Sequence, residues 1–166
     1  MFKIGDKVFY PLHGVGYLSG IEELRINANF KVYYKIYITD QKLFIYVPKE
    51  KAQKLGLRLI SSVTKLRSVS QRPYDHKKNL TLSYFERTSS LKEQLRLGRC
   101  EDLIQLARDS RYAMNKKIKL SREEHDIFKT ANSLLEQEIM MIEGVSSQVA
   151  REFIENDFKK ISERTI

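Results

Sequence analysis

The sequence predicts an α+β protein of two domains, in which a small antiparallel β barrel is followed by a bundle of four or five helices. Apolar residues alternate with a period of two through the first 60 residues, which is the spacing of strands with one buried face. Beyond residue 60 the spacing becomes helical. We therefore expect a β domain over residues 1–59 and a helical domain over residues 60–166.

Four segments of the β domain are predicted strands. KVFYPL and GVGYLSGIEELRI come first, and Gly14, Gly16 and Gly20 suit the turns and sharp bends of a small barrel. FKVYYKIYI and KLFIYVP follow, and the short TDQ between them favours a hairpin. A closed or nearly closed sheet of four or five strands is expected. The alternation places on its buried face Phe30, Val32, Tyr34, Ile36, Ile38, Leu43, Ile45 and Val47.

The opposite face of the last two strands is expected to carry an aromatic patch. Apolar surface of this kind, with a polar rim, is typical of protein interfaces. The alternative is that the helical domain packs over this face. The expected members are Tyr33, Tyr37, Phe44 and Tyr46, rimmed by Lys31, Lys35 and Lys42.

Two helix signals stand out in the second domain. SREE is a capping box, in which the Ser121 hydroxyl accepts from the Glu124 amide while the Glu124 carboxylate reaches back. Gly98 and Gly144 each follow a helical segment, as C-terminal glycines do. The spacing predicts helices over residues 82–97, 100–114, 121–143 and 146–161.

Composition argues against several classes of protein. No apolar run approaches the roughly 20 residues needed to cross a bilayer, and the start, MFKIGDKVFY, lacks the apolar block of a signal peptide. Cys100 is the single cysteine, and His13, His76 and His125 are scattered, which disfavours a disulfide or a zinc site. We expect a cytoplasmic protein, associated with the nucleoid if it binds DNA, with no metal and no cofactor.

Positive charge is concentrated in the middle of the chain. The formal charge is +9, to which residues 1–58 contribute +5, residues 59–100 contribute +6 and residues 101–166 contribute −2. A local excess of Lys and Arg is the electrostatic footprint of a protein that binds a polyanion, because each neutralised phosphate releases a counterion. Lysines that only keep the surface soluble are the alternative. The clustering favours nucleic acid.

The sequence shows no arrangement typical of an enzyme. HGVG lacks the spacing and the terminal Lys-Ser/Thr of a phosphate-binding loop and lies between predicted strands, so a turn is the better interpretation. Cys100 with His125 or His76 would make a nucleophile and a base, but Cys100 lies where a helix begins and is better explained as a small residue there. We expect a protein without enzymatic activity.

The helical domain combines basic residues with exposed aromatic candidates. Tyr84 and Phe85 are adjacent at the start of a helix, and neighbouring side chains diverge by about 100°, so one ring is free to be exposed. Cations that contact phosphates beside a ring that stacks on bases are typical of nucleic-acid binding. The alternative is that both rings belong to the core. The DNA-binding candidates are Tyr84, Arg87, Lys92, Arg96, Arg99, Lys77, Lys78 and Arg72.

The order of motifs along the chain resembles the CarD/CdnL family of bacterial transcription regulators. MFKIGDKVFYPLHGVGYLSGIEE and FIYVPKEKA are similar to that family's strands, with its Gly-Asp pair, Tyr-Pro, His-Gly turn and Val-Pro. SLKEQLRLGRCEDLIQLARDS resembles its Leu-rich helix, glycine and following helix, and KLSREEHDIFKTANSLLEQEI resembles its long capped helix. The resemblance covers nearly the whole chain.

The resemblance implies a Tudor-like N-terminal domain, shared with transcription-repair coupling factors, that binds the β subunit of RNA polymerase. It also implies a helical domain that binds double-stranded promoter DNA at the upstream edge of the melted bubble, in a monomeric protein. In the family a tryptophan at the start of a helix wedges into the minor groove. Counting back from Gly98 places Tyr84 at that position and leaves Phe85 to anchor the helix in the core.

The resemblance also indicates where the polymerase contact lies. Two arginines of the family correspond to Tyr46 and Leu24, and Arg25 is next to the latter. The polymerase-binding candidates are Tyr46, Arg25, Phe44, Tyr37 and Lys42. Two other functions stay open, a DNA-binding protein that acts without RNA polymerase docking and a protein-interaction module whose lysines only solubilise it.

Overall fold

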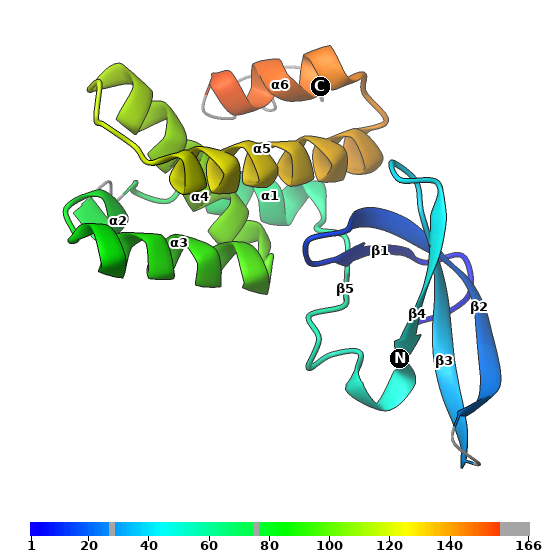
Figure 1. Cartoon of the computed structure of the whole chain (residues 1–166). Helices are drawn as coiled ribbons and strands as arrows, with labels where there is room; N and C mark the ends of the chain where they lie inside the picture. Colours follow the sequence, from blue (N-terminus) through cyan, green and yellow to red (C-terminus); the bar gives the residue numbers. More distant parts are fainter. Residues whose placement is uncertain (27–28, 75–76, 157–166) are drawn as a thin grey trace. The chain divides into compact units, whose positions relative to one another are not determined.

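The computed structural model describes residues 1–26, 29–74 and 77–156, except for the side chains of residues 77 and 78. The chain divides into two compact units, Met1–Ile60, here called the β unit, and Ser61–Ile166, the helical unit. Strands form the first unit and helices the second (Figure 1). The predicted α+β fold class is confirmed.

The β unit is a five-stranded antiparallel sheet in the order β4-β3-β2-β1-β5. β2 and β3 are its long strands, and a register shift between Leu18 and Gly20 marks a bulge in β2. Within the described residues, no pairing joins the end strands β4 and β5, so the sheet is open and the expected barrel describes it only loosely. The strands are β1 Lys7–Tyr10, β2 Gly14–Ile26, β3 Asn29–Ile38, β4 Leu43–Pro48 and β5 Arg58–Leu59, with a 3-10 turn at Lys49–Lys51.

The core of the β unit covers only part of the β2–β3 hairpin. Phe30 and Val32, predicted to face inward, are 65% and 37% exposed. β4 ends at Pro48, which pairs with Tyr33, so the residues of β3 before Tyr33 pair with β2 alone. The period of two is correct, but this end of the hairpin extends past the core, as the long ribbon in Figure 1 shows. Leu43, at the start of β4, is likewise 39% exposed. The buried core is Val8, Leu18, Tyr34, Ile36, Ile38, Val47, Ala52 and Leu57.

The helical unit is built around α4 and α5, the two helices that pack against most of the others (Figure 1). Four of its helices confirm the predicted segments, and α1 and α2 precede them. The part of the predicted helix 146–161 that follows residue 156 lies outside the described residues. The helices are α1 Val63–Ser70, α2 Lys77–Leu80, α3 Tyr84–Leu97, α4 Cys100–Asn115, α5 Arg122–Glu143 and α6 Ser147–Glu155.

The predicted helix ends are confirmed by their hydrogen bonds. The Glu124 amide donates to the Ser121 hydroxyl at 3.2 Å, and the Ser121 amide donates to the Glu124 carboxylate at 2.7 Å, which completes the capping box. Gly98 and Gly144 follow α3 and α5 in the left-handed conformation, at φ 58° and 64°. These caps set where α5 begins and where α3 and α5 end.

Two other kinds of feature are absent from the described residues. In residues 1–26, 29–74 and 77–156, no group of three or more His, Cys, Asp or Glu side chains is arranged to hold a metal ion. Across the same described ranges, no helix has the length and apolar content to span a membrane. Cys100 is a free, buried thiol at the first position of α4.

Candidate nucleic-acid and protein interfaces

The first turn of α3 presents two aromatic rings to solvent. Ser83 and Glu86 form a capping box, in which the Ser83 amide donates to the Glu86 carboxylate, so α3 begins at Tyr84. Tyr84 is 44% exposed and Phe85 is 82% exposed, and their ring centroids lie 5.3 Å apart in an edge-to-face arrangement. The two form what we call the ring pair.

The expectation that Phe85 anchors α3 in the core is therefore wrong. Leu91 and Leu95 are the apolar residues of α3 that are buried. Phe85 lies six residues before Leu91, so on a helix its side chain is turned by about 120° from that of Leu91, at the edge of the buried stripe. The ring that sequence analysis assigned to the core is the more accessible member of the pair.

Arg87 does not point freely to solvent but joins α3 to α5. Its guanidinium contacts the Glu124 carboxylate at 2.5 Å, and the Arg87 side chain is 13% exposed while that of Glu124 is fully buried. Burial raises the pKa of Glu124, but the bonds from Arg87 and from the Ser121 amide outweigh it and hold that pKa below its ordinary value. The contact commits Arg87 to the interior of the unit.

Three other cations of the candidate set form ion pairs at the surface. Lys92 contacts Glu123 at 2.7 Å, Arg96 contacts Glu93 at 2.7 Å and Arg99 contacts Asp102 at 2.6 Å. The pairs of Lys92 and Arg96 are exposed on both sides and contribute about 0–1 kcal/mol, so a phosphate can compete for these two cations at small cost. Arg99 is 61% exposed, but its partner Asp102 is 8% exposed. Arg72 is exposed, whereas the side chains of Lys77 and Lys78 lie outside the described part of the chain.

A buried polar network holds the segment that leads into α3. Asp109 of α4, which is fully buried, accepts hydrogen bonds from the Tyr74 hydroxyl at 2.9 Å and from the Asn79 side-chain amide at 2.6 Å. The Asn79 oxygen accepts in turn from Ser90 at 2.8 Å and from Gln94 at 3.0 Å, both on α3. Burial, then the charge of Asp109, raises the pKa of Tyr74. The network thus joins Tyr74 to α4 and Asn79 to both α3 and α4.

Sequence analysis missed this network, although a signal was available. Asn79 and Asp109 are polar, yet they occupy positions at which helical spacing directs a side chain inward, and buried polar groups occur where they are hydrogen-bonded. Arg108 adds to the same attachment, because its guanidinium donates to the backbone carbonyls of Ser70 and Arg72. The ring pair therefore lies on a helix that is preceded by residues, Tyr74 and Asn79, whose side chains are held by hydrogen bonds to Asp109.

On the β unit, the aromatic patch is built around a lysine. Tyr37 and Phe44 are cross-strand partners with ring centroids 5.2 Å apart. The Lys35 ammonium lies 5.0 Å from the Phe44 ring centroid and 5.6 Å from that of Tyr46, and it contacts Glu22 at 3.0 Å. Phe44 and Tyr46 are 53% and 41% exposed.

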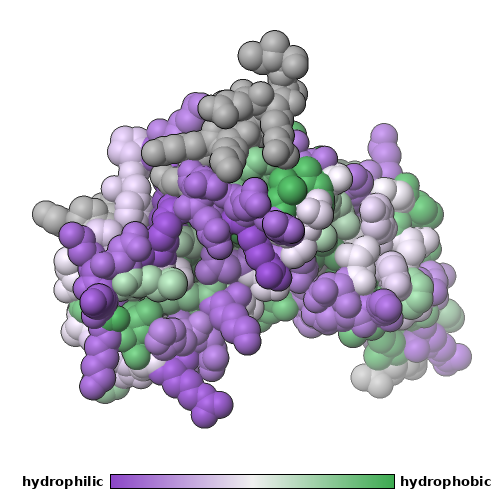
Figure 2. All heavy atoms as spheres, turned by 90° about the horizontal axis from the view of Figure 1, so that it is seen from above, coloured by the Kyte–Doolittle hydropathy of each residue, from purple (hydrophilic) through white to green (hydrophobic). Residues whose placement is uncertain are grey.

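Not every residue expected in this region joins the patch. Tyr33 is 9% exposed and so contributes little surface. Lys42 is exposed in the β3–β4 turn, in a left-handed conformation at φ 52°. Arg25 pairs with Phe30, five residues along β3 from Lys35, a separation of about 17 Å at the rise of a strand. The patch, here defined as Lys35, Tyr37, Phe44 and Tyr46, thus excludes Arg25. Over the visible face of the β unit, at the right of Figure 2, hydrophobic and intermediate side chains (green and pale) are interspersed with hydrophilic ones (purple).

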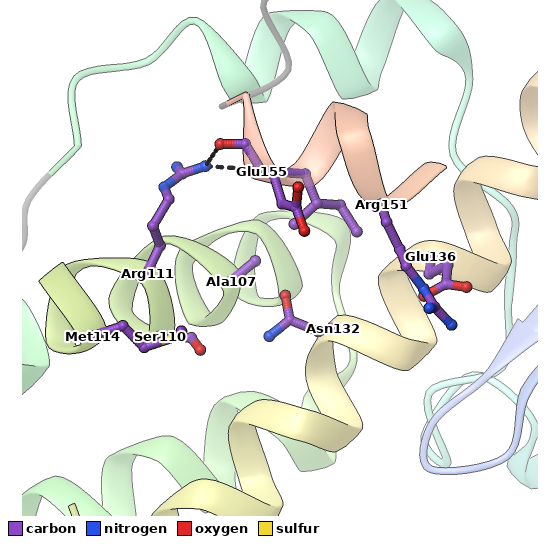
Figure 3. Close-up of a pocket in the computed structure, with 9 residues that line it drawn as sticks. Ala107, Ser110, Arg111, Met114, Asn132, Glu136, Arg151 and Glu155 are labelled. Carbon is purple, nitrogen blue, oxygen red and sulfur yellow. Dashed lines mark hydrogen bonds and ion pairs between the residues drawn. The ribbon is translucent and has the colours of Figure 1, made fainter. Parts of the chain in front are cut away.

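A pocket of about 430 Å³ between α4, α5 and α6 contains none of the predicted site residues. In Figure 3, Arg111 of α4 reaches the end of α6, where it donates to the carbonyl oxygens of Ile154 and Glu155 at 2.6 and 2.7 Å. Arg151 contacts Glu136 at 2.9 Å on another side of the pocket. These bonds satisfy helix-end carbonyls and join the helices, which is a structural role.

Comparison with known proteins supports the resemblance seen in the sequence. Residues 2–61 match the family model of the CarD-like/TRCF RID domain. The chain is 23% identical over 153 residues to a protein of Bacillus subtilis (strain 168) named "Putative transcription factor YdeB". That similarity covers 92% of this chain and 99% of the relative.

Proposed function

We propose that this chain, whose residues 2–61 match the CarD-like/TRCF RID domain, is a transcription regulator that binds the RNA polymerase β subunit through the β unit and promoter DNA through the helical unit. The RID match is the observation that carries the proposal, because the relatives of this domain interact with RNA polymerase. The chain would act in the cytoplasm, at DNA and without catalysing a reaction.

The aromatic patch supports the polymerase contact. Phe44 and Tyr46 offer flat apolar surface, and Lys35 between them adds a cation, a mixture of the kind that interfaces use at their centre. The patch also continues to the free edge of β4, the end strand of the sheet, where backbone groups are available to a partner. The β subunit is the partner that we assign to this surface.

The ring pair supports the DNA contact. An exposed aromatic ring on a well-held helix can enter a base step that has begun to unstack, whereas it gains little from an intact duplex. Binding energy realised only with melted or bent DNA favours that state by the same amount, and nothing is consumed. We propose that the regulator shifts open-complex formation in this way, with Tyr84 and Phe85 acting together.

Replacing Tyr46 with alanine is expected to weaken binding of the full chain to the isolated β-subunit lobe about tenfold, because loss of a central interface ring costs on the order of 1–2 kcal/mol. Titration calorimetry measures the dissociation constant. Leu55→Ala is the matched control, since Leu55 is 43% exposed on the β unit but outside the patch. An unchanged constant for Tyr46→Ala, or equal weakening by Leu55→Ala, would remove the patch from the contact. A wild-type chain that binds DNA but not the lobe would point to action without polymerase docking.

Replacing both Tyr84 and Phe85 with alanine is expected to weaken binding to a forked promoter DNA by about 10- to 100-fold, since stacking of one base on an aromatic ring contributes roughly 1–3 kcal/mol. Binding to plain duplex should change less than about threefold, because phosphate contacts dominate there. Fluorescence anisotropy with both DNAs gives the comparison. Phe85→Leu keeps an apolar side chain without the ring and should lose part of the preference for forked DNA. A double variant that binds forked DNA and duplex as the wild type does would refute the role of the ring pair as a wedge.

A further inference from the structure

A group of four cations lies between the end of α4 and the first residue of α5, outside the candidate set taken from the sequence. Lys116, Lys117, Lys119 and Arg122, here called the loop cations, are all exposed. In the described part of the chain none of them forms an ion pair, whereas Lys92, Arg96 and Arg99 each do. Their charge is therefore available to a partner.

The backbone of this connection is ordered by its own hydrogen bonds. The Ile118 amide donates to the Ala113 carbonyl at 2.9 Å, and the Lys117 amide donates to the Met114 carbonyl at 3.2 Å. This is the Schellman pattern that closes a helix, and Lys117 has the left-handed conformation, at φ 53°, for which glycine is the favoured residue. The loop cations are thus presented by a defined turn.

Two of the loop cations occupy positions that folding alone would give to other residues. Lys117 carries a side chain where the left-handed backbone disfavours one. Arg122 is the first residue of α5, where the helix dipole disfavours positive charge. Residues that break local rules are expected at functional sites. Both positions point to a role for the charge outside the fold.

The loop cations lie at the same end of the helical unit as the ring pair. Arg87, near the start of α3, contacts Glu124, near the start of α5, so the beginnings of the two helices are neighbours. In Figure 1 both helices begin toward the left of the unit and run in the same direction. With packed helices about 8–10 Å apart and a rise of 1.5 Å per residue, Arg122 lies on the order of 10–15 Å from Tyr84. Measured along the axis of a duplex, that distance corresponds to about three to four phosphates of one strand.

We propose that the loop cations bind backbone phosphates of the same DNA whose bases the ring pair meets, and so supply the part of the affinity that does not depend on melting. This inference rests on the proposed function. In this proposal the ring pair distinguishes forked DNA from plain duplex, whereas the loop cations bind both. The reason is that phosphate contacts position a protein on DNA without reading the bases.

The test is a triple variant, Lys117→Gly, Lys119→Gln and Arg122→Gln, in the full chain. Glycine suits the left-handed position and glutamine removes a cation from the start of α5, so the unfolding midpoint is expected to stay the same or rise. The salt dependence of DNA binding is expected to fall, with the log–log slope smaller by about 2.7, since each phosphate contact contributes about 0.9. Affinity for fork and for plain duplex should fall together, by tenfold or more at low salt.

The matched control removes three exposed cations of the β unit by Lys3→Gln, Lys51→Gln and Lys54→Gln, and should keep the wild-type slope. A triple variant with the wild-type slope, or a control that lowers the slope equally, would overturn the inference while leaving the ring pair intact. Wild-type protein that binds neither DNA would overturn the proposed DNA contact and this inference with it. Protection of the three loop lysines from acetylation by bound duplex, read by mass spectrometry, is the second expected result.

Discussion

Replacing Arg87 with methionine is expected to lower the free energy of unfolding of the helical unit by about 3 kcal/mol. The substitution keeps the aliphatic volume but leaves the Glu124 carboxylate buried without its cation, and breaking one side of such a pair costs roughly 3–5 kcal/mol. Urea unfolding followed by circular dichroism at 222 nm reports the helices. Lys92→Met is the matched control, because its pair with Glu123 is half exposed and should contribute about 0–1 kcal/mol.

The pH dependence of the same variant tests the assignment to Glu124. In the wild type the folded-state pKa of Glu124 lies below its ordinary value of 4.5, so the stabilisation is present above about pH 4.5 and is lost as the pH falls through the folded-state pKa. Without Arg87, burial favours the neutral acid, and the gap between wild type and variant should close at low pH. Adding Glu124→Gln to Arg87→Met should recover part of the loss at pH 7. A gap that is equal at pH 3.5 and pH 7 would mean that another group is the partner.

Replacing Asp109 with alanine is expected to destabilise the helical unit by about 3–4 kcal/mol. The carboxylate accepts from Tyr74, Asn79 and Gln105 at 2.9, 2.6 and 3.1 Å, and removing it takes this acceptor from the buried Asn79 amide and from the half-buried Tyr74 and Gln105 donors. Each such donor costs roughly 1–3 kcal/mol, with some recovered by rearrangement. Urea unfolding measures the loss, and Asp126→Ala, at an exposed position of α5, should change stability by less than about 0.5 kcal/mol.

The conservative variant Asp109→Asn connects this network to function. It keeps the shape of the side chain but offers fewer acceptors, so we expect a folded protein in which Tyr74 and Asn79 are held more loosely. Amide hydrogen exchange at Tyr74 and Asn79 should speed up, and fork binding should weaken although the ring pair is intact, because a wedge must be held in place to transmit binding energy. Unchanged exchange and unchanged fork binding would limit the network to overall stability.

Together these contacts explain how a polar helix start can present two rings. Arg87 and Glu124 attach the first turn of α3 to α5, and the Asn79–Asp109 network attaches the segment before it to α4. The ring pair then needs no packing of its own, and Phe85 can remain 82% exposed. Buried polar contacts thus hold two apolar rings in place at the surface.

Several features were predictable because they depend on neighbours in sequence. The change from a period of two to helical spacing gave the two kinds of unit, the SREE capping box gave the start of α5, and Gly98 and Gly144 gave two helix ends. The loop cations were overlooked because the net charge of residues 101–166 is −2, which hides the local run KKIKLSR. A shorter window over the sequence would have found that run.

Other features depend on which elements pack together, and spacing along one element carries no information about its neighbours. The period of two placed Phe30 and Val32 on the correct face, but their exposure follows from where β4 ends. Arg87 and Arg99 look alike in sequence, yet only Arg87 faces the start of α5 and so becomes an interior group rather than a surface cation. A periodic pattern defines one face of a helix or strand, whereas burial and charge pairing depend on a second element that packs against that face. For Phe85, Arg87 and Asp109, exposure, ion pairing and burial were therefore decided by the packing of helices that are far apart in the chain.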